Sequence, residues 1–258
     1  MRSESGAGRE AIVQAPLALG FDRVEKRFAD STLALDGMDL RIQRGEFVAV
    51  VGPSGCGKST LLRLASGLSK PTAGTVQVES DEVGYVFQDP TLLPWRSVAR
   101  NVELAAELER LPKSERRGRA ADAIKLVGLA GFERHLPRML SGGMKMRVSL
   151  ARSLVLDPDL CLFDEPFGAL DELTRERLNA ELLDLYATRR FTGLFVTHSV
   201  GEAVFLSTRV VLMSPRPGRV VADIPVPFDY PRSRELRFTP EFAELAARVS
   251  RTLREGEQ

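Results

Sequence analysis

The sequence is short of the features that mark secreted proteins. Its 258 residues include only two cysteines, Cys56 and Cys161, which are too few for a disulfide framework. The N-terminal stretch carries Glu4, Glu10 and Gln14, where a signal peptide needs an unbroken apolar segment. We therefore expect the chain to stay in a reducing compartment.

Long apolar runs and an excess of charge of one sign are missing too. The longest apolar runs are short, as at 47–51, far below the roughly 18 residues of a membrane helix. Lys plus Arg number 36 and Asp plus Glu 35, a net charge of +1, which gives no global field to attract nucleic acid. Glycine (21) and proline (15) stay below the roughly one quarter that is typical of low-complexity chains. These absences predict a globular chain that does not cross a bilayer unaided, has no nucleic-acid partner, and binds anions only locally.

What the sequence does have is a succession of short apolar runs and glycine-rich turns, which predicts an α/β fold. The first residues, 1–16, are small, polar and aperiodic, and we expect them to be disordered. The expected elements that follow are strands between 17 and 51, a helix from about Lys58, a hairpin over 75–87, a charged helical insertion at 101–127, a helix from Ser141, buried strands at 160–163, 193–196 and 210–213, a strand at 220–221, and a last helix after Thr239 that packs on its own domain.

A glycine-rich segment follows the buried strand at 47–51 and fits the phosphate-loop pattern. Glycines let backbone amides converge on phosphate oxygens, and the following helix points its positive end at the same anion. Lys58 adds a mobile charge for β- and γ-phosphates, and the Ser59 hydroxyl can ligate Mg²⁺. The predicted phosphate-binding residues are Gly52, Pro53, Ser54, Gly55, Cys56, Gly57, Lys58, Ser59 and Thr60.

Cys56 stands inside this loop, beside Lys58 and a helix N-terminus. Such an environment can lower the pKa of a thiol. We hypothesise that alkylation of Cys56 blocks ATP binding and that ATP protects the thiol. The alternative is that Cys56 is only a small residue that fits.

Two adjacent acids, Asp164 and Glu165, end the apolar run at 160–163. A buried strand that ends in carboxylates presents them at the edge of a sheet where nucleotides bind in open α/β folds. Asp164 would hold a metal, and Glu165 would orient or deprotonate an attacking water. The alternative is a solvated strand end before a turn at Pro166.

The segment Leu140-Ser141-Gly142-Gly143-Met144 opens a helix shortly before the acidic strand. Its glycines would expose amides to an anion, although an ordinary helix cap has the same pattern. With these motifs in this order, the chain resembles the nucleotide-binding ATPase subunits of ABC transporters over roughly Leu17 to Val221. That resemblance implies a RecA-like P-loop NTPase core at 17–225 with an antiparallel β subdomain and an α-helical insertion subdomain at about 89–140. A short C-terminal extension with a helix, 226–258, would follow.

The resemblance also implies roles for single residues, with ATP and Mg²⁺ as the ligands. Phe28 matches the aromatic that stacks on adenine, with a plain core aromatic as the alternative. Gln88, in Val-Phe-Gln-Asp-Pro, matches the glutamine that senses Mg²⁺. His198 matches the histidine that contacts the γ-phosphate and supports Glu165. Lys58, Gln88, Glu165 and His198 are therefore the predicted catalytic residues, and Ser59, Gln88 and Asp164 the predicted metal ligands.

In this family the site is completed by a second subunit. Ser141, Gly142 and Gly143 match the signature that contacts the γ-phosphate bound by the opposite subunit, and Asp171 lies in the loop that crosses between subunits. The chain departs from many members at Met144, where glutamine is usual, so a nucleotide contact from that side chain is not carried over.

The same Met-containing signature, with Pro-Thr-Leu-Leu-Pro-Trp-Arg after Gln88 and Thr-His-Ser-Val-Gly-Glu-Ala at His198, is similar to the nitrate, sulfonate and taurine importers, a group that includes relatives for pyrimidine vitamin precursors. The resemblance implies a homodimer on the cytoplasmic face of the inner cell membrane. It would drive separate permease subunits and serve, indirectly, an extracytoplasmic solute-binding protein. Trp95 and Arg96 are of types favoured at interfaces, though local packing would also explain them.

Two other classes stay open. A small-molecule phosphotransferase shares the phosphate loop, but the signature at 140–143 and the positions of Gln88 and His198 argue against it. A nucleic-acid or translation ATPase of the same superfamily would need tandem domains or a long coiled-coil insertion. Only about fifty residues separate Gln88 from Leu140, which leaves no room for such an insertion.

Overall fold

The structure, a computed structural model, describes residues 15–256, so the prediction of a disordered N-terminus falls almost wholly outside the described residues. The strands are β1 (Leu17–Arg27), β2 (Leu33–Gln43), β3 (Phe47–Val51), β4 (Ala73–Val78), β5 (Val83–Val86), β6 (Leu160–Asp164), β7 (Thr192–Thr197), β8 (Arg209–Met213) and β9 (Val220–Pro225). The helices of more than one turn are α1 (Lys58–Ala65), α2 (Val98–Val102), α3 (Leu104–Leu108), α4 (Lys113–Leu126), α5 (Gly142–Leu154), α6 (Glu172–Arg189), α7 (Val200–Leu206) and α8 (Pro240–Glu255).

The strands form two sheets. Six strands are ordered β5-β6-β7-β3-β8-β9, parallel except where β9 runs antiparallel to β8. The other three form an antiparallel sheet in the order β2-β1-β4. A mostly parallel sheet with helical crossovers is the α/β architecture, so the predicted fold class and the antiparallel β subdomain are confirmed.

The predicted hairpin over 75–87 is wrong. β4 pairs with β1, with Val76 opposite Phe21, whereas β5 pairs with β6, with Val83 opposite Leu160. The turn residues at 79–82 therefore connect two sheets. Local turn signals do not record the distant partner of each strand, and here the long β1 edge and the buried β6 edge supply those partners.

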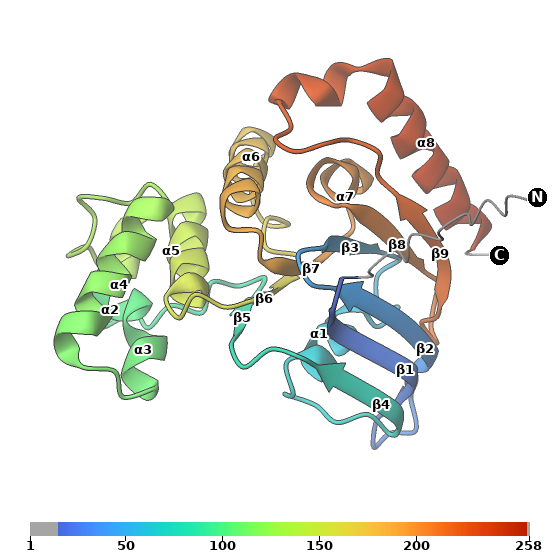
Figure 1. The fold of residues 1–258 in the computed structure, drawn as a ribbon, viewed down its shortest axis with the longest axis horizontal. Coiled ribbons are helices and arrows are strands. Elements are labelled where there is room, and N and C mark those ends of the chain that lie inside the picture. Colours follow the sequence, from blue (N-terminus) through green and yellow to red (C-terminus); the bar gives the residue numbers. More distant parts are fainter. Residues whose placement is uncertain (1–14, 257–258) are drawn as a thin grey trace, which may run out of the picture.

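The central strand β3 is buried on both faces, which explains its unbroken apolar run. Phe47, Ala49 and Val51 pack toward the side of α6, α7 and α8, and Val48 and Val50 pack toward α1 and the antiparallel sheet. Figure 1 shows the six-stranded sheet between these two layers. Because β3 and β6 are neighbours of β7 in one parallel sheet, the segments after them, 52–59 and 164–165, emerge at the same sheet edge.

Helices α2 to α5 form a lobe to one side of the sheets, seen in green at the left of Figure 1. Helix α5 packs against α2 and α4 and also reaches β5, so it links the lobe to the sheet edge. At the other end of the chain, α8 buries Phe242, Leu245 and Val249 against α7 and β8, the apolar face that its spacing predicts. Within 15–256, no helix is long and apolar enough to span a membrane.

Candidate nucleotide site

The phosphate loop (residues 52–59) follows β3 and ends at the N-terminus of α1, as the sequence predicts. Gly57 has φ +106°, and a Cβ there would lie 2.7 Å from Leu35 Cδ2 and 2.9 Å from the Ala34 carbonyl oxygen. Only glycine fits this close turn against β2. The turn lets helix α1 begin directly at Lys58, so its positive end faces the loop.

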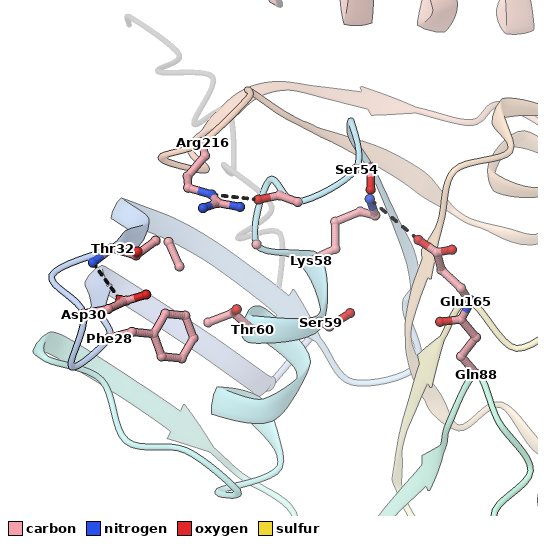
Figure 2. A pocket seen from close by; sticks show the side chains of 13 residues that line it. Phe28, Asp30, Thr32, Ser54, Lys58, Ser59, Thr60, Gln88, Glu165 and Arg216 are labelled. Atoms are coloured by element: carbon pink, nitrogen blue, oxygen red, sulfur yellow. Dashed lines mark hydrogen bonds and ion pairs between the residues drawn. The ribbon is translucent and has the colours of Figure 1, made fainter.

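A cavity of about 580 Å³ opens beside this loop. Figure 2 shows that its walls come from the β1–β2 connection, the phosphate loop, Gln88, Glu165 and the turn that carries Arg216. Its lining residues are Phe28, Asp30, Thr32, Ala34, Ser54, Gly55, Gly57, Lys58, Ser59, Thr60, Gln88, Glu165 and Arg216. The structure thus brings Phe28 and Gln88, 60 positions apart in the numbering, to one cavity with the loop.

Four of the lining residues, Asp30, Thr32, Ala34 and Arg216, were not among the predicted site residues. Asp30 and Thr32 lie on the β1–β2 connection, where Thr32 N donates a hydrogen bond to Asp30 Oδ1 at 3.0 Å. They follow Phe28 so closely that its predicted role could have pointed to them. Arg216 carried no such signal, because it lies in a turn far along the chain.

Lys58 is the buried cation of the site. Its side chain is 6% exposed and its Nζ lies 3.7 Å from Glu165 Oε1. The same Nζ donates hydrogen bonds to the Gly52 and Pro53 carbonyl oxygens at 2.9 and 3.1 Å. The two carbonyls hold the ammonium beside the loop, and Glu165 is its carboxylate partner within the described residues.

Ser59 and Asp164 form a pair of oxygen donors beside the cavity. Ser59 Oγ donates to Asp164 Oδ1 at 2.9 Å, and the Tyr85 hydroxyl donates to Oδ2 at 3.4 Å. Burial raises the pKa of Asp164, and the Ser59 hydrogen bond opposes that shift. Mg²⁺ prefers oxygen ligands and commonly takes one or two carboxylates together with substrate phosphates. A hydroxyl, a carboxylate and the nearby Gln88 amide fit that preference.

Glu165 sits at the edge of the cavity between two basic side chains. Its Oε2 lies 3.1 Å from His198 Nδ1, and its Oε1 lies 3.7 Å from Lys58 Nζ. Its backbone has φ +42°, which is rare for a residue other than glycine. The Glu165 amide donates to the Val196 carbonyl oxygen at 3.0 Å, so strand β7 holds this unusual backbone in place.

The sequence-based expectation that its environment lowers the pKa of the Cys56 thiol is wrong, whereas the effect of alkylation on ATP binding stays a prediction. The residue is 1% exposed, and burial raises the pKa of its thiol more than the Lys58 charge lowers it. Its Sγ lies 2.8 Å from where a Cβ of Gly52 would be. The thiol therefore packs under the loop as a small residue that fits.

The remaining predicted residues do not line the cavity of their own chain. Ser141 is exposed and caps α5, where it accepts a hydrogen bond from Met144 N at 3.3 Å. Asp171 is exposed as well and caps α6 by accepting from Thr174 N at 3.0 Å. Gly142 and Gly143 form the first turn of α5, so this chain alone leaves its Ser-Gly-Gly tip apart from its own cavity.

The chain is similar to proteins of one known family. A family model described as "ABC transporter" matches residues 35–168. The aliphatic sulfonates import ATP-binding protein SsuB 1 of Mesorhizobium japonicum is 47% identical over 232 residues, covering 88% of this chain and 86% of its own.

The nitrate import ATP-binding protein NrtD of Synechococcus elongatus is 42% identical over 241 residues, covering 88% of each chain. Among solved structures, the dimeric post-hydrolysis state of the ATP-binding cassette MJ0796 bound to ADP and Pi superimposes with a TM-score of 0.71. It shares 32% identity and covers 82% of this chain and 100% of its own.

Proposed function

The chain belongs to the ABC transporter family and is an ATPase of that family, and from this premise we propose that it powers an importer by hydrolysing MgATP between two copies of itself. The observation that carries the proposal is the convergence of Lys58, Ser59 and Glu165 on one cavity that also holds Phe28. A base-stacking ring at one end and a cation with a carboxylate at the other suit a nucleoside triphosphate.

In the proposed reaction, the adenine stacks on Phe28 and the amides of the phosphate loop bind the β- and γ-phosphates. Ser59, Gln88 and Asp164 would hold Mg²⁺, which neutralises charge on the phosphate oxygens. Glu165 orients the attacking water and accepts its proton, and His198 Nδ1 holds the Glu165 carboxylate at Oε2, 3.1 Å away. Lys58 stabilises the charge that grows on the γ-phosphate.

We propose a two-fold homodimer because the Ser141 tip is exposed and lies outside its own cavity. In a two-fold pair, a surface of one chain meets the same surface of the other. Each tip, with Gly142 and Gly143, would then complete the opposite cavity, and Asp171 would lie at the same interface. The similarity to a cassette whose structure is dimeric with ADP and Pi supports this arrangement.

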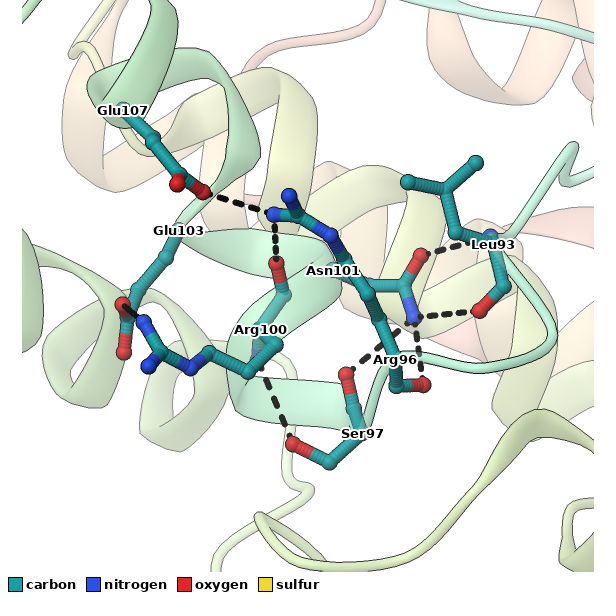
Figure 3. Close-up of polar contacts among 7 residues, drawn as sticks. All are labelled: Leu93, Arg96, Ser97, Arg100, Asn101, Glu103 and Glu107. Carbon is teal, nitrogen blue, oxygen red and sulfur yellow. Dashed lines mark hydrogen bonds and ion pairs between the residues drawn. The ribbon is translucent and has the colours of Figure 1, made fainter.

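The permease would contact the segment 93–97, at the junction of the lobe and the sheet. Figure 3 shows Asn101 pointing into this segment. Its Nδ2 donates to the carbonyl oxygens of Leu93, Arg96 and Ser97 at 3.2, 2.9 and 3.1 Å, and its Oδ1 accepts from Leu93 N at 2.8 Å. Asn101 is fully buried, so it holds the segment in one conformation.

This conformation leaves Trp95 74% exposed, whereas Arg96 is bound to Glu107 at 2.7 Å. Of the two residues, Arg96 is therefore engaged locally and Trp95 is available to a partner. A separate apolar hollow of about 300 Å³ between β5, α3 and α5 includes Phe87 and Leu108, and also Thr91, which precedes the segment 93–97 in the chain. Exposed aromatic and apolar side chains beside a hollow suit a helix of a permease.

The solute class comes from the relatives, whose names specify nitrate and aliphatic sulfonates. We propose that the transporter takes up a small anion of this kind with an extracytoplasmic solute-binding protein. The ATPase would sit peripherally on the cytoplasmic face of the inner cell membrane.

Mixing two inactive variants tests the shared site. Lys58→Ala removes the cation of a chain's own cavity, and Ser141→Arg blocks the tip that it offers to its partner. Each variant alone should hydrolyse no ATP. In an equal mixture about half of the pairs are mixed, and each of these has one intact site, so about a quarter of wild-type activity should return.

No recovery in pairs shown to exchange subunits would contradict the shared site. The fate of the phosphoryl group separates the alternatives. Phosphate released into water supports an ATPase, and phosphate found on an added acceptor would indicate a phosphotransferase.

A further inference from the structure

The turn between β8 and β9, residues 214–219, reaches the nucleotide cavity and is stabilised by hydrogen bonds within the turn. Ser214 N donates to the Arg219 carbonyl oxygen at 3.0 Å. Ser214 Oγ accepts from Arg219 N at 3.0 Å and donates to the Pro217 carbonyl oxygen at 3.1 Å. The turn is therefore held by its own backbone and one serine.

The same turn is fixed to the walls of the cavity. Gly218 N donates to the Ala34 carbonyl oxygen at 2.9 Å, and Asp36 N donates to the Gly218 carbonyl oxygen at 3.1 Å. A Cβ at Gly218 would lie only 2.1 Å from the Cys56 carbonyl oxygen. Only glycine allows so close an approach to the phosphate loop, so the turn, β2 and the loop keep one relative position.

Arg216 projects from this fixed turn between two prolines, Pro215 and Pro217, which restrict its backbone. Its Nε donates to the Gly55 carbonyl oxygen at 3.3 Å, and its side chain lines the cavity. Figure 2 shows its guanidinium on the opposite side of the cavity from the Phe28 ring. One edge of the guanidinium is thus anchored on the loop, and the other donors remain for a ligand.

The charge of Arg216 has no carboxylate partner at ion-pair distance within residues 15–256. Arg219, three residues later on the same turn, is instead paired with Asp36. Within one turn, then, Arg219 is ion-paired, whereas Arg216 faces the cavity, where Asp30 is the carboxylate that senses its charge without pairing with it. A planar guanidinium with free donors is suited to phosphate oxygens.

We propose that Arg216 binds the nucleotide where the ribose joins the phosphates, by donating to the α-phosphate. The inference rests on the proposed ATP site. With the base on Phe28 and the β- and γ-phosphates on the amides of the loop and on Lys58, the ribose and the α-phosphate must pass between these two ends. Arg216 stands over that middle portion, anchored at Gly55, and supplies a second positive charge that comes from neither the phosphate loop nor the other predicted residues.

The test compares the affinities of the purified chain for MgATP and MgADP, both of which carry the α-phosphate. Arg216→Ala should weaken both by a similar factor, about 10- to 100-fold, as expected for a lost charge-assisted hydrogen bond. Arg216→Lys should recover part of the loss. Arg219→Ala, an arginine of the same turn that does not line the cavity, is the matched control and should leave both affinities unchanged.

The variant Arg216→Gln separates binding from bracing, because an amide can still donate to Gly55 but carries no charge. Affinity restored by Gln would mean that Arg216 only braces the loop and would overturn the proposal. So would unchanged affinities in Arg216→Ala, or a loss confined to ATP, which would place the contact at the γ-phosphate. If the wild-type chain binds neither nucleotide, the proposed function fails instead. Arg216 is exposed, and thermal unfolding without nucleotide checks that each variant is folded.

Discussion

We predict that the substitution Glu165→Gln separates nucleotide binding from hydrolysis at the proposed site. In the structure, Glu165 Oε2 lies 3.1 Å from His198 Nδ1. Gln has the same size and keeps an oxygen for this contact, but it lacks the negative charge. A residue that accepts a proton in the transition state contributes about 10²- to 10⁴-fold to the rate. We expect hydrolysis to fall by that factor.

Binding should change in the opposite direction. Glu165 Oε1 lies 3.7 Å from Lys58 Nζ, a Coulomb attraction of about 1 kcal/mol with the screening of water and about 4 kcal/mol at an effective dielectric constant near 20. Because the carboxylate is partly exposed and Lys58 has two carbonyl partners, the attraction is close to the lower value. Without the Glu165 charge, the Lys58 ammonium interacts more strongly with the γ-phosphate. ATP should therefore bind about fivefold tighter.

Single-turnover hydrolysis and equilibrium binding of ATP to the same preparation measure the two effects, and size-exclusion chromatography with ATP should show a trapped dimer. Turnover within tenfold of the wild-type rate would remove Glu165 from the role of base. ATP affinity that weakens would show that the carboxylate does not draw charge away from the phosphate.

Two further predictions follow from burial and exposure. Because burial raises the pKa of the Cys56 thiol, only a small fraction of this thiol is ionised near neutral pH. Iodoacetamide should therefore label Cys56 at least about tenfold more slowly in the native chain than in the urea-unfolded chain at pH 8. Equal labelling rates, measured by mass spectrometry of the Cys56 peptide, would refute the buried position. Trp95→Ala should abolish copurification with the permease while leaving the unfolding free energy within about 0.5 kcal/mol, because the ring is 74% exposed. Phe238→Ala, which removes an aromatic that is 84% exposed on the C-terminal extension, is the control that should retain the permease, and retention by both variants would move the docking surface elsewhere.

The parts of the site that lie within one short stretch could be predicted from sequence. The phosphate loop is one such stretch, because an apolar strand, a glycine turn and a helix start at Lys58 are each visible locally. The two acids at 164–165 were likewise placed correctly at the end of β6 and its following turn, since the apolar run before them leaves no other end to the strand.

Features that depend on contacts between residues far apart in the sequence could not be predicted. The role of Arg216 in the cavity wall follows from contacts with Gly55 and β2 that no local pattern records, and the separate sheets of β4 and β5 follow from pairing with β1 and β6. Helix α6 was missed for another reason. Its apolar and charged residues are not cleanly separated onto two faces, so the periodic pattern that predicts an amphipathic helix is weak, and the Asp171 side chain caps this helix.

The left-handed backbone at Glu165, with φ +42°, has a consequence for how this sequence can change over time. A side chain held in that region destabilises the fold by on the order of 1 kcal/mol, and glycine would relieve it. At this position, the substitution that would stabilise the fold, Glu165→Gly, therefore also removes the carboxylate. With Glu165 as the proposed base, stability of the fold favours glycine at this position, whereas hydrolysis favours the carboxylate.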